Sequence, residues 1–329
     1  MVTSAQDLSL VVPVNNGGNN FVKCLRSLLA ASPPPGEIIV VVDGGEDESW
    51  KVAQAAGVRV IREISCGGPA KARNRGVREA SGEIILFIDA DVVIPPDLLG
   101  RIANIFAQEP ELAALIGSYD DKPAALNFFS RYKNLLHHFT HQHAETDASS
   151  FWGACGAVRR QIFLDLGGFD EGYRTPSIED IELGYRMTAA EYRIKLDKSL
   201  QVQHLKRWDM LSLLKTDFLH RALPWSGLIL HRRRFINDLN LRISSRISVL
   251  LTFGMIASLG AALFRPQLGI VAAGLFLMVL SLNVRLLLFF CRKGGPWFAI
   301  RGMGWHYCYF LYSGLAFALA GTRHLLLRP

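Results

Sequence analysis

The last 86 residues of this 329-residue chain contain no aspartate or glutamate. All 29 acidic residues lie at or before Asp238, whereas eight basic residues follow residue 243. The first 243 residues hold 28 basic and 29 acidic side chains, so the tail accounts for the net charge of +7. This division excludes one uniform globular chain. It also argues against a nucleic-acid-binding protein with one continuous basic face, and we expect no nucleic-acid partner.

Paired cysteines are also missing. The five cysteines are scattered and no two of them form a Cys-x-x-Cys pair: Cys24, Cys66, Cys155, Cys291 and Cys308. The pattern provides neither a disulfide framework nor a thiolate metal site, and it is typical of a reducing compartment. The N-terminus lacks a basic segment followed by an apolar one, so we expect no cleavable signal peptide.

Long apolar runs, by contrast, are abundant in the acid-free tail. Residues 247–264 contain no charge, residues 268–290 contain one, Arg285, and residues 303–321 contain none if the histidine there is neutral. A membrane-spanning helix needs about 20 apolar residues. We therefore expect residues 244–329 to form a transmembrane region of about three helices.

The basic residues around these runs predict an orientation. They cluster before the first run and between the second and third: Arg232, Arg233, Arg234, Arg242, Arg246, Arg292, Lys293 and Arg301. The loop between the first two runs has a single one, Arg265. By the positive-inside rule, the large N-terminal region is cytoplasmic and the protein is a multi-pass protein of the cytoplasmic (inner) membrane. Arg285 is expected to snorkel, and three spans place Arg323 and Arg328 on the outer side, where basic residues are unfavourable.

Residues 208–243 are expected to form an interfacial amphipathic region. Apolar residues recur there at spacings of three or four: Trp208, Leu211, Leu214, Phe218, Ala222, Trp225 and Ile229. Pro224 should kink or end this helix, and the basic run His231–Arg234 would face anionic headgroups. A helix packed in a soluble core is the alternative interpretation.

Short β runs alternate with helical stretches over the first 120 residues. The expected strands are Leu8–Val14, Ile38–Val42, Arg59–Arg62 and Ile84–Ile88, and the expected helices are Asn19–Ala31, Lys51–Ala56 and Ala70–Ala80. Such alternation predicts a doubly wound α/β sheet with parallel strands. Ligands of such sheets bind at the carboxyl ends of the strands.

Acidic residues follow two of these strands. Asp43 comes directly after Ile38–Val42, and Asp89 and Asp91 come directly after Ile84–Ile88. Two carboxylates one residue apart can bind a hard cation such as Mg²⁺ or Mn²⁺, which would neutralise a diphosphate leaving group. An Asp-x-Asp sequence by itself is also typical of a turn or a helix cap.

Six segments together resemble glycosyltransferase family 2. They are Val11–Gly17, Val42–Gly45, Gly68–Gly76, Ser81–Asp91, Gly167–Glu171 and Glu179–Leu183. The resemblance implies a GT-A fold over residues 1–207, with a nucleotide-sugar half (1–117) and an acceptor half (118–207). It also implies inverting transfer from a nucleotide-diphospho-sugar, a UDP- or GDP-sugar, with Mn²⁺ or Mg²⁺ as cofactor.

The resemblance assigns donor-site roles residue by residue. Asp43 would bind the base or ribose, with Pro13 and Asn15 in the same pocket. Arg73 and Asn74 would lie near the donor, where a guanidinium can pair with phosphate. The family usually has an aromatic residue in place of Asn15, so the resemblance does not assign a residue that stacks on the base. It often has an aspartate in place of Gly44.

The resemblance also assigns the metal and the catalytic groups. Asp91 would ligate the metal, Asp89 would face the metal or the ribose, and His204 falls where many relatives have a metal-proximal histidine. Asp180 would be the general base, with Glu179 beside it. Inverting transfer needs a base for the acceptor proton and stabilisation of the departing diphosphate. Acidic residues at a helix N-terminus are the alternative for this pair.

Two further segments each have a functional and a structural interpretation. Phe151–Arg160 resembles the family's acceptor segment, with a tight strand turn as the alternative. His137 and His141 are spaced i, i+4 and could share a metal on one helix face, although an ordinary amphipathic helix with surface or acceptor-lining histidines fits the surrounding residues better. Arg221 and Trp225 partly match the Gln-x-x-Arg-Trp motif of processive polysaccharide synthases.

These observations predict a membrane-anchored inverting glycosyltransferase with a cytoplasmic GT-A domain. Its partners would be a nucleotide sugar, the lipid bilayer, and a hydroxyl acceptor that is lipid-linked or polyprenyl-linked. A processive polysaccharide synthase is the first alternative, and a non-catalytic membrane scaffold is the second.

Overall fold

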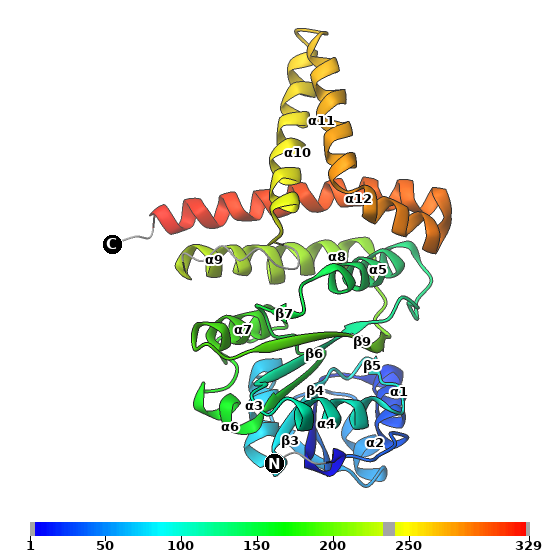
Figure 1. The fold of residues 1–329 in the computed structure, drawn as a ribbon, viewed down its shortest axis with the longest axis vertical. Coiled ribbons are helices and arrows are strands. Elements are labelled where there is room, and N and C mark those ends of the chain that lie inside the picture. The colour runs from blue at the N-terminus through cyan, green and yellow to red at the C-terminus, as the bar shows by residue number, and fades with distance from the viewer. Residues whose placement is uncertain (1–3, 233–240, 327–329) are drawn as a thin grey trace. The chain divides into compact units, whose positions relative to one another are not determined.

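The computed structural model describes residues 4–232 and 241–326. The chain divides into two compact units, Met1–Trp208 and Asp209–Pro329. The first unit is a mixed α/β domain and the second is helical (Figure 1). The α/β class expected from the sequence is confirmed for the first unit.

The first unit contains one large sheet with the strand order β3-β2-β1-β4-β8-β6-β9-β5, and β7 pairs with β9. The strands are β1 (Leu8–Val14), β2 (Glu37–Asp43), β3 (Arg59–Glu63), β4 (Ile84–Ile88), β5 (Val92–Val93), β6 (Ala114–Tyr119), β7 (Asp147–Ala148), β8 (Cys155–Arg159) and β9 (Ile194–His204). The first four are parallel to one another, as the continuous β-branched runs predict, whereas β8 is antiparallel to both β4 and β6. β6 and β9 are parallel.

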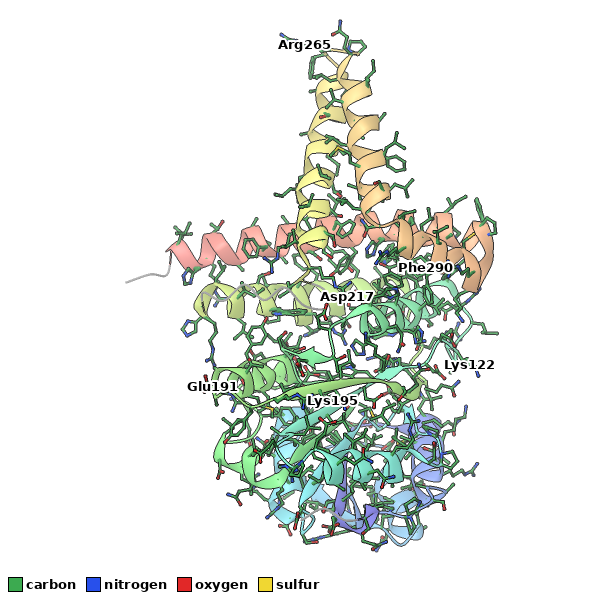
Figure 2. All side chains as sticks on the ribbon, in the orientation of Figure 1. Lys122, Glu191, Lys195, Asp217, Arg265 and Phe290 are labelled. Atoms are coloured by element: carbon green, nitrogen blue, oxygen red, sulfur yellow. The ribbon has the colours of Figure 1, made fainter. Side chains whose placement is uncertain are left out.

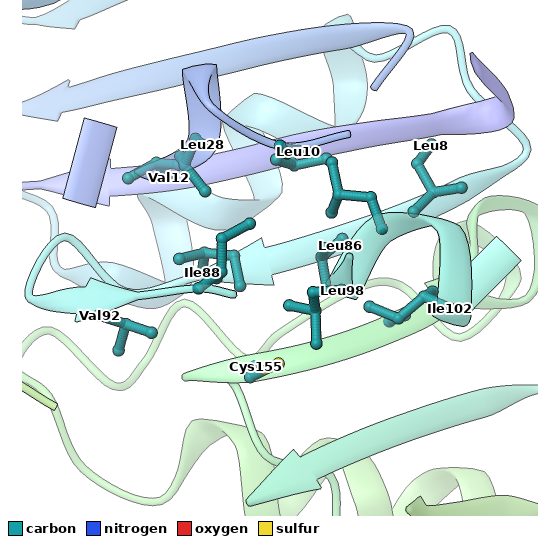
Figure 3. Close-up of a cluster of buried hydrophobic side chains, with 14 of the residues drawn as sticks. Leu8, Leu10, Val12, Leu28, Leu86, Ile88, Val92, Leu98, Ile102 and Cys155 are labelled. Carbon is teal, nitrogen blue, oxygen red and sulfur yellow. The ribbon is translucent and has the colours of Figure 1, made fainter. Parts of the chain in front are cut away.

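Helices cover both faces of the parallel part of the sheet. The helices of this unit are α1 (Gly18–Leu29), α2 (Ser49–Ala55), α3 (Pro69–Glu79), α4 (Leu98–Gln108), α5 (Phe128–His143), α6 (Arg160–Asp165) and α7 (Glu179–Ala189), with a short 3₁₀ turn at Ala5–Asp7. A Cβ on Gly76 would lie 2.4 Å from Val11 Cγ1, so this glycine allows α3 to approach β1 closely. Figure 3 shows the core on the opposite face, where alternate side chains of β1 and β4 pack against α1 and α4: Leu8, Leu10, Val12, Leu28, Leu86, Ile88, Leu98 and Ile102.

The second unit consists of helices and a π-helical turn. They are α8 (Met210–Lys215), the π-helical turn Thr216–Ala222, α9 (Leu223–Arg232), α10 (Ile243–Ala262), α11 (Leu268–Leu282) and α12 (Val284–Leu326). Pro224 does not end the helix, because the π-helical turn directly precedes it and lets the chain continue from α8 into α9. The part of the 208–243 segment from 233 to 240 lies outside the described residues.

The number of membrane-spanning helices differs from the three expected. Among the described residues, α10 is the one helix that is long and apolar enough by itself to cross a membrane, and the bent pair α11 and α12 would make a second. The run 268–290 is broken at Asn283, where the two helices meet at 68°. The run 303–321 lies inside α12, and its tryptophan, histidine and tyrosine side chains carry polar atoms that lower its hydropathy. Counting charged residues along the sequence detected neither the break at Asn283 nor the low hydropathy of residues 303–321.

Candidate functional site

The expected donor residues gather at the carboxyl ends of β1, β2 and β4. β1 lies between β2 and β4 and is parallel to both, so Asn15, Asp43 and Asp89 come to one edge of the sheet. Asn15 Nδ2 donates to the backbone oxygen of Asp43 at 2.6 Å, which ties the end of β1 to the end of β2. Pro13 lies within β1 opposite Val41 of β2 and is half-buried.

The Asp43 carboxylate holds the loop that leads into α3. It is buried and accepts hydrogen bonds from the backbone N–H groups of Gly67, at 2.7 Å, and Gly68, at 2.8 Å. The Cys66 thiol donates to it at 3.3 Å. Partial burial, together with this hydrogen bond, raises the pKa of the Cys66 thiol. Asp43 therefore shapes the loop between β3 and α3.

Gly44 has a structural reason for replacing the family's second aspartate. Its φ is +62°, and a Cβ there would lie 2.4 Å from the backbone nitrogen of Cys66. Both the left-handed conformation and the close approach of the neighbouring loop favour glycine.

The structure places Arg73 between two carboxylates. Its Nη2 donates to Asp89 Oδ1 at 2.6 Å, and its Nη1 donates to Glu179 Oε1 at 2.9 Å. Burial alone would lower the pKa of Arg73, but the charges of Asp89, Glu179 and Asp180 outweigh burial and raise it. The guanidinium thus joins the end of β4 to the start of α7.

Asn74 has its partners in the loop that follows α6. Its Nδ2 donates to the backbone oxygen of Phe169 at 2.8 Å, and its Oδ1 accepts from the backbone N–H of Phe169 at 2.9 Å. Nδ2 also lies 3.0 Å from Glu171 Oε1. Asn74 is buried, and these contacts fasten α3 to the Gly-Gly-Phe-Asp-Glu loop.

Asp89, Asp91 and His204 form the candidate metal centre. His204 Nε2 lies 3.4 Å from Asp91 Oδ2, because the start of β5 pairs with the end of β9. Burial favours a raised pKa for Asp91, but His204 and Lys206 together outweigh it and hold the pKa of Asp91 below its usual value. Burial, opposed by Arg73 and reinforced by the Asp91 charge, raises the pKa of Asp89.

The types of donor in this centre fit a divalent cation. Two carboxylates and one imidazole suit Mn²⁺, and Mg²⁺ is commonly held by one or two carboxylates together with substrate phosphates. Within residues 4–232 and 241–326, no three such side chains are arranged as a ready-made metal cage.

Asp180 and Glu179 begin α7, and each is hydrogen-bonded at the backbone. Asp180 Oδ2 accepts from the N–H of Gly153 at 3.0 Å, and Oδ1 accepts from the N–H of Ile181 at 2.8 Å. Glu179 Oε2 accepts from the N–H of Ser177 at 2.9 Å. Asp180 is half-buried and Glu179 is buried, so Glu179 stabilises the helix start from inside the domain.

Gly153 lies where these groups meet. A Cβ at this position would lie 3.3 Å from both Cζ and Nη2 of Arg73. The missing side chain therefore leaves room for the Arg73 guanidinium, while the Gly153 N–H orients Asp180. The sequence marked this segment as an acceptor-site candidate, but its contact with Arg73 could not be read from it.

A column of rings lies beside the candidate metal centre, and the sequence did not indicate one of its members, Tyr119. Tyr119, at the end of β6, stacks on His204 with ring centroids 4.4 Å apart and on His137 at 5.7 Å. Trp152 meets Tyr119 edge-on at 4.7 Å and His141 edge-on at 4.9 Å. His137 and His141 thus have separate ring partners. Tyr119 closes an apolar run, which resembles any buried strand end, so the sequence held no specific signal for it.

Comparisons with known proteins bear on the family and the fold of this chain. Residues 9–167 match the family described as glycosyl transferase family 2. The chain is similar to glycosyltransferase GlyG of Streptococcus pneumoniae, with 32% identity over 34% of this chain and 38% of the relative. It is also similar to the pre-mycofactocin glycosyltransferase of Mycobacterium tuberculosis, with 25% identity over 61% of this chain and 43% of the relative. The chain thus spans less than half the length of these curated relatives.

The fold is shared with a solved glycosyltransferase structure. A mannosyltransferase from Pyrobaculum calidifontis, in complex with GDP-Man and Mn²⁺, aligns with a TM-score of 0.57 and 15% identity. The alignment covers 96% of this chain and 89% of that one. At this identity the likeness establishes the fold.

Proposed function

Because residues 9–167 of this chain match the family described as glycosyl transferase family 2, we propose that the protein transfers a sugar from a nucleotide-diphospho-sugar to a hydroxyl acceptor. One observation carries the proposal. Arg73 brings Asp89, beside Asp91, next to Glu179 and hence next to Asp180. A candidate base and a candidate metal centre are thereby joined through one buried side chain.

The proposed reaction is a single displacement that inverts the anomeric carbon. Asp180 accepts the proton of the acceptor hydroxyl while the hydroxyl oxygen bonds to the anomeric carbon. The bond from that carbon to the diphosphate oxygen breaks, and its electron pair leaves with the diphosphate. A carboxylate has about four acceptor positions, so the two backbone N–H bonds orient Asp180 without exhausting it.

The donor site is proposed at the carboxyl edge of β1, β2 and β4. Asp43, Asn15 and Pro13 would line the nucleoside pocket, and Asn74 would support it through the Phe169 loop. A bound Mn²⁺ or Mg²⁺, held by Asp91, His204 and Asp89, would neutralise the leaving diphosphate. The proposed donor is a UDP- or GDP-sugar; the mannosyltransferase of the same fold was solved with GDP-Man and Mn²⁺, which supports a nucleotide-diphospho-sugar here.

We place the acceptor at a membrane, as a lipid-linked or polyprenyl-linked hydroxyl. The support is the acid-free second unit, which contains α10 and its outward-facing apolar side chains. A membrane-bound enzyme with its catalytic unit on the cytoplasmic side would meet its water-soluble donor and its membrane acceptor at one interface.

One assay tests the transfer and its alternatives. The purified full chain is incubated with a panel of UDP- and GDP-sugars, Mn²⁺ and membrane lipid extract, and products are identified by mass spectrometry. We expect a lipid product that carries one added sugar, and we expect none with Asp180→Asn. A long polymer would indicate a processive synthase instead. Absence of transfer with every donor, together with intact cellular function of Asp91→Ala, would favour a scaffold.

A further inference from the structure

Helices α10 and α11 form a hairpin within the second unit. The two helices pack along each other and are joined by the short loop 263–267. Figure 1 shows this hairpin standing away from α9 and α12, which run alongside each other at its base. Arg265 marks the tip of the hairpin in Figure 2.

The surface of the hairpin is apolar along its length. Leu250 on α10 is 73% exposed, Ile270 on α11 is 78% exposed, and Phe264 at the tip is 88% exposed. Between Ile247 and Leu282, Arg265 is the single charged residue. Exposed apolar surface of this extent is unstable in water and marks an interaction site.

A polar contact closes the base of the hairpin. Asn283, at the break between α11 and α12, donates from Nδ2 to Ser248 Oγ of α10 at 3.0 Å and to the backbone oxygen of Val279 at 2.8 Å. Ser248 is fully buried. The chain therefore turns at a fixed point, and Arg285 follows the turn instead of lying inside an unbroken span.

The lengths of the two helices decide how far the hairpin reaches. The uncharged part of α10, residues 247–262, rises about 24 Å, and the 15 residues of α11 rise about 22 Å. A bilayer core is about 30 Å thick, so the loop 263–267 must supply the remaining few ångströms. The long side chain of Arg265 can extend from the tip to headgroups.

Basic residues surround the base of the hairpin. Arg242 and Arg246 precede or begin α10, and Arg292, Lys293 and Arg301 follow the turn. Basic residues favour the cytoplasmic side of a membrane and bind anionic headgroups. Both ends of the hairpin are therefore flanked by the positive charge that is typical of the cytoplasmic side. On the outer surface of α12, Trp297 is 70% exposed and Ile300 is 61% exposed, as in a helix that lies in an interface.

We propose that the partner of this apolar surface is a lipid bilayer, which the α10–α11 hairpin enters and leaves on the same side. Arg265 reaches the far headgroups, and α12 lies along the entry side. The region after residue 284 is consequently on the same side as the first unit. Arg323, which three spans would place on the outer side, then lies with the other basic residues.

Reporter fusions at both ends of the full chain test this topology in a bacterial host. Green fluorescent protein fluoresces on the cytoplasmic side, and alkaline phosphatase is active on the outer side. We expect fluorescence from N-terminal and C-terminal fusions alike, and no phosphatase activity from either. Phosphatase activity of the C-terminal fusion would overturn the proposal and restore an odd number of spans.

Cysteine labelling tests the tip. Cys66, Cys291 and Cys308 are replaced by alanine, whereas Cys24 and Cys155 are buried and can remain. In this background, Arg265→Cys should react with a membrane-impermeant maleimide in intact cells. The matched control Lys293→Cys should react after the membrane is permeabilised. Reaction of Arg265→Cys solely after permeabilisation, or recovery of the protein in the soluble fraction, would overturn the proposal. Neither readout depends on sugar transfer.

Discussion

Arg73 and Glu179 form an ion pair in which Nη1 donates to Oε1 at 2.9 Å, and both side chains are buried. The pair connects α3 to Glu179, the first residue of α7. The second arm of the guanidinium holds Asp89. In the proposed reaction, Arg73 is therefore a positioning residue that would fix the candidate metal centre relative to Asp180.

Arg73→Lys should impair turnover more than donor binding. Lysine keeps the positive charge but lacks the planar fork that holds two carboxylates at once. We expect kcat to fall about 10²-fold, as for misplaced catalytic groups, while UDP or GDP affinity by calorimetry stays within a few-fold. The surface substitution Arg101→Lys serves as the control. A large loss of nucleotide affinity with kcat unchanged would instead show that Arg73 binds phosphate directly.

Gly153→Ala should act through Arg73. The added methyl group would lie 3.3 Å from a guanidinium that two carboxylates hold in place, so Arg73 and Asp180 must shift. We expect a fall in kcat of about tenfold or more with a modest change in melting temperature. Gly227→Ala is the matched control, because no atom lies within 4 Å of its added methyl group. Equal activity of the two variants would contradict this role of Gly153.

Asp180→Asn should abolish transfer while the protein stays folded. The amide keeps the size of the side chain but cannot accept the acceptor proton, and a general base contributes about 10²–10⁴-fold in rate. Nucleotide binding should be unchanged. The same substitution at Asp165, an exposed aspartate at the end of α6, provides the control. Retention of more than a tenth of the wild-type kcat by Asp180→Asn would assign the base to another group.

His204→Phe should weaken Mn²⁺ binding at every pH, because it removes a proposed ligand, and should also move the acid limb of binding to higher pH. His204 lowers the pKa of Asp91 against the effect of burial, so its removal raises that pKa. Asp91 would then ionise at a higher pH, and the acid limb of Mn²⁺ binding should shift upward. Titration of Mn²⁺ followed by electron paramagnetic resonance measures this shift. Its absence would mean that Asp91 does not depend on His204.

Local sequence was sufficient for the parallel strands and the residues that follow them. The run Ile84–Ile88 is continuously apolar, so it had to be a buried strand, and Asp89 and Asp91 had to follow at its carboxyl end. The alternation of strands and helices then led to the doubly wound sheet and to one edge that collects Asn15, Asp43 and Asp89.

Tertiary structure decided which of these side chains meet. Nothing in the sequence around Arg73 specifies Glu179, which is 106 residues away, or the space left by Gly153, because periodicity reports which face is buried and not its partner. The stacking of Tyr119 on His204 was likewise decided by tertiary packing. Composition alone determined that the acid-free tail is apolar and basic, but the number of helices long enough to cross a membrane depended on the turn at Asn283. Hydropathy sums apolar residues along the chain, whereas a hydrogen bond to Ser248 on another helix fixes where that chain turns.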